Sequence, residues 1–107
     1  MKEKVIEKVL LESKLILKLY VSGMTSKSME AIKNLKLLCD EHLKGGFELE
    51  IIDIYKNPKL ALENQIVFSP SLQKKLPLPQ KTLVGTLSDT KKVLSALGVT
   101  FEIVGYE

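Results

Sequence analysis

The chain has 107 residues, of which 45% are hydrophobic and 27% are charged, enough for one compact domain with a single core. Its apolar residues come in short runs rather than in the stretch of about 20 that crosses a bilayer, and its first residues lack the pattern of a secretory signal. We therefore expect a cytoplasmic protein. Its net charge of +3 comes from 16 basic residues that are all lysine. Because arginine supplies the planar fork that reads bases and clamps phosphates, this composition argues against specific nucleic-acid binding.

The single cysteine and the single histidine restrict the possible catalytic classes. One cysteine excludes an intramolecular disulfide, a CxxC redox pair and a cysteine-rich zinc site. Cys39 falls on the apolar stripe of a predicted helix, which indicates a buried structural thiol. His42 lies near the end of that helix, where a partial positive charge is favoured. We predict no metal and no cofactor.

The first half of the chain predicts a strand, a helix and a second strand. Residues 1–14 carry a narrow apolar stripe that fits a helix or a strand, and residues 15–21 are nearly all apolar, as in a strand covered on both faces. An amphipathic helix begins at Thr25 or Ser26 and ends at the glycine pair 45–46. Residues 47–54 alternate and keep Glu48 and Glu50 in water, which is typical of an edge strand. The apolar face of the helix is predicted to hold Met29, Ile32, Leu35, Cys39 and Leu43.

The second half predicts shorter elements. Asn57 followed by Pro58 opens a helix that ends near Glu63. An apolar run, 66–68, precedes a possible strand at 72–75, and prolines then interrupt the chain before a strand at 82–85. Ser88 is predicted to cap a closing helix whose apolar face is Val93, Leu94 and Leu97, and Gly98 to end it. Residues 99–104 have strong strand propensity.

These elements predict an α/β, thioredoxin-like three-layer fold of order βαβ-αββα, with a possible additional C-terminal strand and a sheet of two parallel and two antiparallel contacts. A thioredoxin enzyme carries its nucleophilic cysteine where the first helix begins. Residues 23–28 hold no cysteine there, so we predict no redox activity of the thioredoxin type. Pro70 lies where such folds keep a cis proline, although a plain turn also fits. Tyr20, Tyr55 and Phe68 are expected in the core or at its rim.

Several ordered motifs between about residues 15 and 97 resemble the KaiB family. They are LKLYVSG at 17–23 with Thr25 and Ser28, IDI at 52–54, KNP at 56–58, PSL at 70–72, LPLP at 76–79, GTLS at 85–88 and KVL at 92–94. The resemblance places the domain at residues 15–107 after an N-terminal extension, 1–14.

The resemblance implies a small regulator that is not an enzyme and that binds the ATPase ring of a KaiC-type protein. It also implies a relation to the sensory domain of the histidine kinase SasA, so a docking module for such a kinase is the alternative. KaiB proteins switch between a thioredoxin-like monomer and a tetrameric ground state with a different C-terminal half. That ground-state fold is therefore the second candidate, and a dimer or tetramer is possible.

The resemblance also suggests binding residues. Lys18, Lys74 and Lys81 match basic positions that the family uses at the ring, whereas Glu30 and Glu50 stand where the family commonly has Arg and Lys. Edge pairing is expected along the exposed backbone of Ser69, Pro70, Ser71 and Leu72.

Two further positions bear on the fold state. Ala96 stands where the family usually has glycine, and Gly98 stands where it has aspartate. Since alanine favours a helix over glycine by about 1 kcal/mol, we expect a closing helix and hence the thioredoxin-like state.

Overall fold

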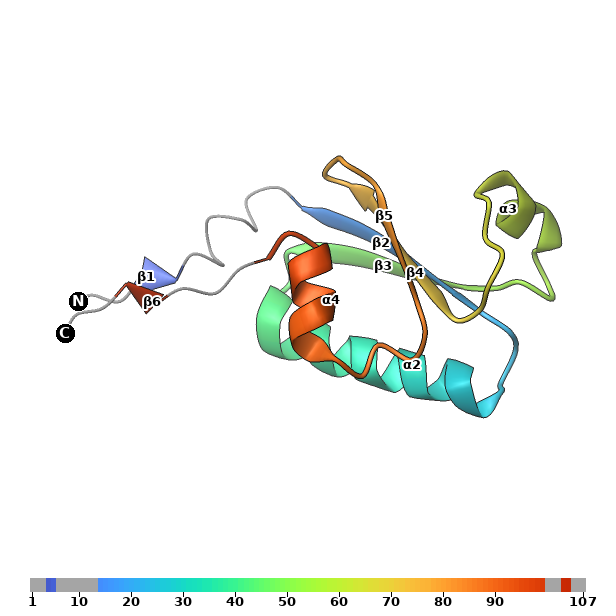
Figure 1. Ribbon diagram of the computed structural model, residues 1–107, viewed down its shortest axis with the longest axis horizontal. Coiled ribbons are helices and arrows are strands. Elements are labelled where there is room, and N and C mark those ends of the chain that lie inside the picture. Colours follow the sequence, from blue (N-terminus) through green and yellow to red (C-terminus); the bar gives the residue numbers. More distant parts are fainter. Residues whose placement is uncertain (1–3, 6–13, 100–102, 105–107) are drawn as a thin grey trace.

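The computed structural model describes residues 4–5, 14–99 and 103–104, with side chains described for 14–99 (Figure 1). Helices and strands alternate along the chain much as the sequence predicts. In order they are β1 (Lys4–Val5), β2 (Leu15–Val21), α2 (Ser26–Leu38), a π-helical turn (Cys39–Leu43), β3 (Phe47–Asp53), α3 (Pro58–Glu63), β4 (Ser71–Leu76), β5 (Lys81–Val84), α4 (Thr90–Ala96) and β6 (Ile103–Val104).

A four-stranded sheet of order β3-β2-β4-β5 forms the centre of the molecule. The contact β2–β3 is parallel, and the contacts β2–β4 and β4–β5 are antiparallel. The prediction of two parallel and two antiparallel contacts is therefore wrong, because an open sheet of four strands has three contacts. The prediction that 47–54 forms an edge strand is confirmed.

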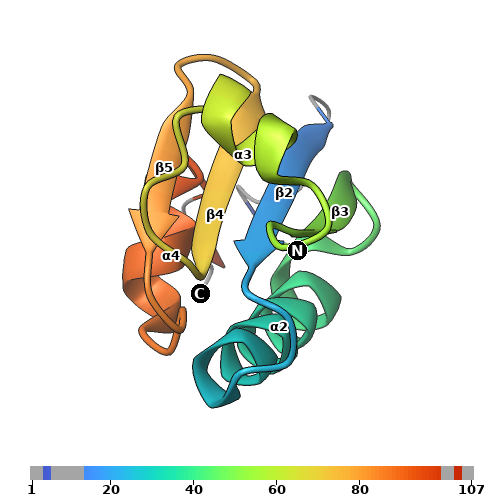
Figure 2. The same ribbon diagram turned by 90° about the vertical axis from the view of Figure 1, so that its right-hand side faces the viewer.

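Helices cover both faces of the sheet. Figures 1 and 2 show α2 and α4 together on one side and α3 on the other. Leu17, Leu19 and Val21 of β2 are buried toward α2 and α4, in one cluster with Leu35 and Leu94. On the opposite face, Tyr20 and Ile52 are buried, and α3 contributes the buried Ala61. This is the expected three-layer arrangement, with β2 covered on both faces.

The apolar face of α2 differs from the predicted stripe. Met29 is 44% exposed, whereas Leu38 and Cys39 are both buried. The last turn of the helix widens, and the N–H of Lys44 donates to the carbonyl of Cys39, five residues back. Leu38 and Cys39 lie three and four residues after the buried Leu35, so ordinary helical spacing places both on the face that packs against the core.

Local capping also differs from the sequence reading at two helices. Asp89, not Ser88, caps α4, because its carboxylate accepts from the N–H of Lys92. Asn57 precedes α3 as predicted, but its side chain donates to the carbonyl of Asp53 instead of capping the helix. The bonds before Pro77 and Pro79 are cis, which the sequence analysis did not predict.

The terminal strands form a separate two-stranded ribbon. Lys4 pairs with Val104 and Val5 with Ile103, antiparallel. The expected C-terminal strand thus exists at 103–104 but joins β1 and not the main sheet, while Val99 lies outside any strand and residues 100–102 lie outside the described residues. The described helices are all too short or too polar to cross a membrane.

Candidate partner-binding site

The loop between β2 and α2 is built from hydroxyl groups. Thr25 caps α2 by accepting from the N–H of Ser28, and its own hydroxyl donates to the Ser28 hydroxyl at 2.8 Å. Ser28 is fully buried, and its hydroxyl also accepts from the N–H of Ser22 at 3.0 Å. Hydroxyl side chains therefore occupy the helix start at which a redox enzyme would hold a thiolate.

Cys39 lies away from this loop, on the core side of the helical segment. Its side chain is 2% exposed, and burial, followed by the charge of Asp40, raises its pKa to about 12. A thiol with such a pKa stays protonated at neutral pH and is a poor nucleophile. The prediction of a buried structural cysteine is confirmed.

The segment at Pro70 is hydrogen-bonded to neighbouring parts of the chain. The Ser69–Pro70 bond is cis, which decides between the two readings of that proline. The carbonyl of Pro70 accepts from the N–H of Gly85 at 2.9 Å, the Ser69 hydroxyl donates to the carbonyl of Tyr20, and the Ser71 hydroxyl donates to the carbonyl of Phe68. Backbone and side chains here are occupied by contacts within the chain.

The backbone that follows Pro70 is not a free edge. Ser71 pairs with Tyr20 on β2 and with Val84 on β5, and Leu72 pairs with Leu19 and Leu83. A strand paired on both sides offers no backbone groups to a third strand. The backbone of Ser71 and Leu72 is therefore closed to edge pairing in this fold, and the outer edges of the four-stranded sheet belong to β3 and β5.

The three lysines from the family pattern do not form one surface. Apolar and polar residues do not alternate along β4, so its sequence does not show which side chains face the core. The strand register places Lys74 beside Leu17 and Lys81, on the face that packs against α2 and α4. Lys18 pairs with Gln73 on the opposite face. Lys81 is exposed, Lys18 is partly buried, and Lys74 is 4% exposed.

Lys18 is engaged in an ion pair. Its ammonium lies 2.7 Å from the Glu50 carboxylate on the neighbouring strand, and Lys14 pairs in the same way with Glu48 at 3.2 Å. Glu50, one of the two acidic departures from the family pattern, is thus balanced locally by Lys18. Glu30 lies exposed on α2.

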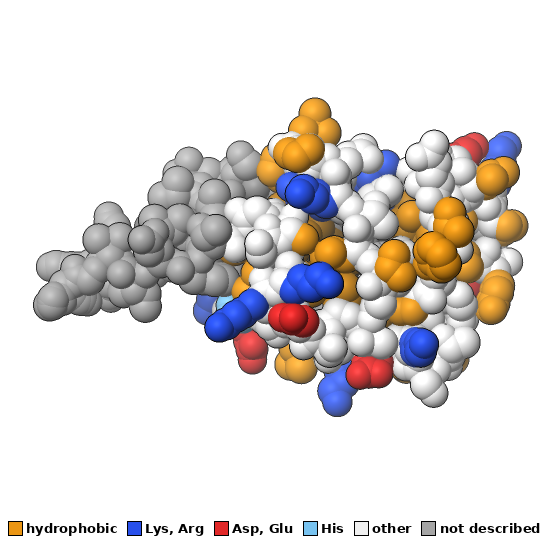
Figure 3. Space-filling view, viewed as in Figure 1, with side chains coloured by type: hydrophobic (Ala, Val, Ile, Leu, Met, Phe, Trp, Pro, Cys, Tyr) orange, Lys and Arg blue, Asp and Glu red, His pale blue; other side chains and the backbone are white. Residues whose placement is uncertain are grey.

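Exposed apolar residues gather at the end of the molecule that holds α3 and the β2–α2 loop (Figure 3). We call them the distal apolar surface; they are Met24, Tyr55, Leu62, Val67 and Phe68, each more than 60% exposed. The Tyr55 ring lies 3.5 Å from the position that a side chain on Gly23 would take, and Asp53 joins the two loops by accepting from the N–H groups of Gly23 and Tyr55. Of Tyr20, Tyr55 and Phe68, the aromatic residues expected in the core or at its rim, Tyr20 is buried and the other two are exposed.

Sequence reasoning missed this surface. The run 66–68 has the composition of a strand, yet it forms none, and it exposes Val67 and Phe68. The signal that was present is the serine-proline pair that follows, because such pairs mark turns and loops.

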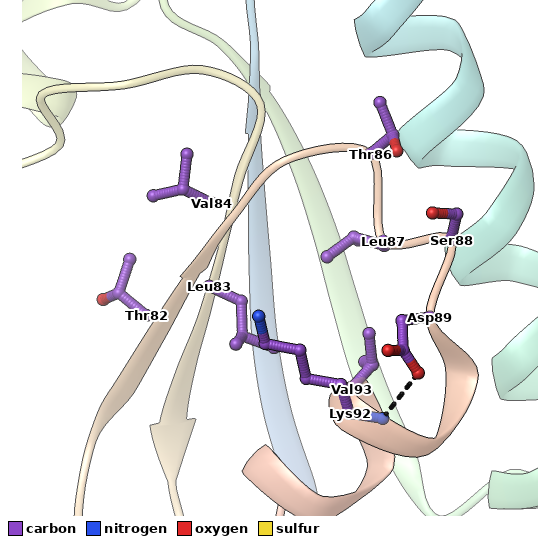
Figure 4. A pocket seen from close by; sticks show the side chains of 9 residues that line it. All are labelled: Thr82, Leu83, Val84, Thr86, Leu87, Ser88, Asp89, Lys92 and Val93. Atoms are coloured by element: carbon purple, nitrogen blue, oxygen red, sulfur yellow. Dashed lines mark hydrogen bonds between the residues drawn. The ribbon is translucent and has the colours of Figure 1, made fainter.

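A shallow cavity of about 400 Å³ lies between β5 and α4 (Figure 4). Thr82, Thr86 and Ser88 contribute hydroxyl groups, and Asp89 is already used as the cap of α4 at 3.1 Å from the Lys92 nitrogen. Within the described ranges, no group of three His, Cys, Asp or Glu side chains is arranged to hold a metal.

Comparison with known proteins agrees with this geometry. A family model described as the KaiB domain matches residues 18–99. The circadian clock oscillator protein KaiB of Rippkaea orientalis is 45% identical over 87 residues, covering 81% of this chain and 84% of that protein. The protein of the same name from Synechococcus elongatus is 45% identical over 86 residues, covering 80% and 84%.

Solved structures show the same fold at low identity. The N-terminal domain of Synechococcus elongatus SasA has a TM-score of 0.66 at 22% identity, over 79% of this chain and 84% of that one. Chloroplastic thioredoxin z has a TM-score of 0.66 at 16% identity, over 79% and 76%. The molecule is therefore a thioredoxin-like domain whose first helix begins without a cysteine. Within that class, the chain belongs to the KaiB family.

Proposed function

We propose that this chain is a cytoplasmic, non-enzymatic regulatory adaptor that binds the ATPase ring of a KaiC-type protein. One observation carries the proposal: a KaiB-family chain has the thioredoxin-like fold, yet hydroxyl groups replace the thiol at the start of α2. A redox reaction has no nucleophile at that position, so the surface around it is available for binding a partner.

The binding surface differs from the one expected from sequence. Lys81 is exposed on β5, an edge strand of the sheet, and the distal apolar surface includes Val67 and Phe68 of the segment that leads to Pro70. Exposed apolar clusters supply affinity, whereas exposed lysines mainly accelerate encounter with an acidic partner. We assign these roles to the distal apolar surface and to Lys81, and a smaller one to Lys18, because Glu50 already pairs with it.

Co-elution tests the proposal. The purified chain is mixed with the KaiC-type ATPase from the same source and ATP, and the mixture is analysed by size-exclusion chromatography with light scattering. A stable complex is expected. Absence of a complex at micromolar concentrations, with both proteins folded, would overturn the proposal, and binding to a histidine kinase instead would establish the alternative role.

A matched pair of variants tests the assignment of Lys81. We expect Lys81→Glu to slow association with the ring by on the order of tenfold at low salt, because the reversed charge opposes encounter. Lys36→Glu, an exposed position on α2, has the same change of charge and should associate at nearly the wild-type rate. Equal association rates for the two variants in interferometry would remove Lys81 from the mechanism.

A further inference from the structure

The ammonium group of Lys74 is buried beneath the β4–β5 pair. Lys74 is 4% exposed. Among residues 14–99, no carboxylate, carbonyl or hydroxyl forms an ion pair or hydrogen bond with its ammonium. Because no side chain pairs with it, this cation is costly to bury unless water or an anion in the adjoining space solvates it.

The neighbouring charge makes the need for an anion greater. The Cα partner of Lys74 on β5 is Lys81, a second cation on the same face of the sheet. Burial, and then the charge of Lys81, lower the pKa of Lys74. The two lysines together produce a positive potential that no described side chain nearby neutralises.

A cavity of about 260 Å³ opens at Lys74. Its walls are otherwise apolar or backbone: Leu15, residues 77–79 and residues 97–99. Gly98 lies where any side chain would reduce this space, since the Lys74 nitrogen is 3.9 Å from the position of an added Cβ. The space greatly exceeds the roughly 30 Å³ that one water takes up in the liquid.

The Lys74 ammonium and the apolar walls of this cavity together indicate what kind of ligand it can bind. We propose that this cavity binds a small organic anion, a carboxylate carried on a short aliphatic chain. The carboxylate pairs with the Lys74 ammonium under the added field of Lys81, and the aliphatic chain contacts Leu78 and Leu97. Phosphate is a poorer fit, because the site has no arginine and its apolar walls do not replace the hydration of a dianion. The proposal does not depend on binding to an ATPase ring.

Titration with butyrate, followed by the amide resonances of residues 97–99, tests the site. A saturable change is expected with butyrate. Butyramide has nearly the same size without the charge and should bind at least about tenfold more weakly, since a hydrogen bond to a charged group contributes about 1.5–3 kcal/mol. Equal affinity for the two compounds, or no saturable change with butyrate, would overturn the proposal.

Two variants of adjacent residues identify the cation. Lys74→Met keeps the length of the side chain and should reduce butyrate affinity at least about tenfold. Lys75→Met removes the same charge from the other face of β4, where the Lys75 ammonium binds Asn64 at 2.9 Å, and should bind butyrate as the wild type does. Retained affinity in a folded Lys74→Met protein, shown by its amide spectrum, would contradict the assignment. These titrations use the chain alone, so their failure leaves the ring-binding test unaffected.

Discussion

Lys74 is the residue at which sequence and structure diverge most. The family resemblance groups Lys74 with Lys18 and Lys81 as binding residues, but the strand register places it under the sheet, with its ammonium facing a cavity. In the sequence SLQKKL, nothing marks Lys74 as buried and Lys75 as partly exposed. The difference arises because β4 is paired on both sides and α4 covers one of its faces.

This placement predicts that removing the charge stabilises the free protein. Lys74→Met should raise the free energy of unfolding at pH 7 by about 1–3 kcal/mol, because an unpaired buried charge is replaced by an apolar chain of similar length. Chemical denaturation followed by circular dichroism measures the change. Lys75→Met removes a lysine that is hydrogen-bonded, so it should not raise the free energy of unfolding. If Lys74→Met lowered that free energy, the charge of Lys74 would be compensated in the fold.

The same residue predicts a pH dependence. Burial and Lys81 lower the pKa of Lys74 in the folded state from the ordinary 10.5, so the unfolded chain retains this proton to higher pH. Stability attributable to Lys74 therefore rises as pH increases from the lowered pKa towards 10.5, since more protons are bound in the unfolded state there. The advantage of Lys74→Met over the wild type should shrink between pH 7 and pH 10, and a constant difference would argue against the lowered pKa.

At the scale of elements, the closing helix α4 is present where the sequence predicts it. α4 ends at Ala96, the N–H of Val99 donates to the carbonyl of Leu94, and Gly98 has φ +82°. Alanine supports the last turn, and glycine adopts the left-handed conformation that the helix end requires. Sequence predicted both the helix and its end, because these preferences are local.

Restoring the residues that the family usually has should weaken this element. Ala96→Gly costs up to about 1 kcal/mol and Gly98→Asp about 1 kcal/mol, because aspartate must take a left-handed conformation. We expect the double variant to lose hydrogen-exchange protection at Leu97 and Val99 and to show a second set of amide resonances from the alternative fold. Ser95→Gly is the control: it weakens the same exposed helix turn without restoring the family pattern, and should show one set. A single, fully protected set in the double variant would refute the role of these positions.

The sequence predicted less well which strands pair with one another through their backbones. The alternation of 47–54 identified an edge strand correctly, since one face of that strand meets water. Residues 69–72 have no such alternation, and only the antiparallel neighbours on both sides show that the backbone of Ser71 and Leu72 is closed to a partner.

For the whole molecule, the described core is complete within one chain. β2 is covered on both faces, and α2, α4 and the sheet enclose a single apolar cluster. We therefore expect the free chain to be a monomer of 12.0 kDa by light scattering. A stable tetramer at micromolar concentration would contradict this expectation and indicate the alternative fold in solution.

The sequence alone determined the family, the order of the elements and the missing nucleophile of α2, because each depends on residue identity and local spacing. The tertiary structure decided which lysines meet water, which strand edges are open and that residues 66–68 are exposed. Burial and backbone pairing are set by neighbours far away in the chain. For this reason one lysine, Lys81 on β5, is a surface charge, and another, Lys74 on β4, is a buried cation.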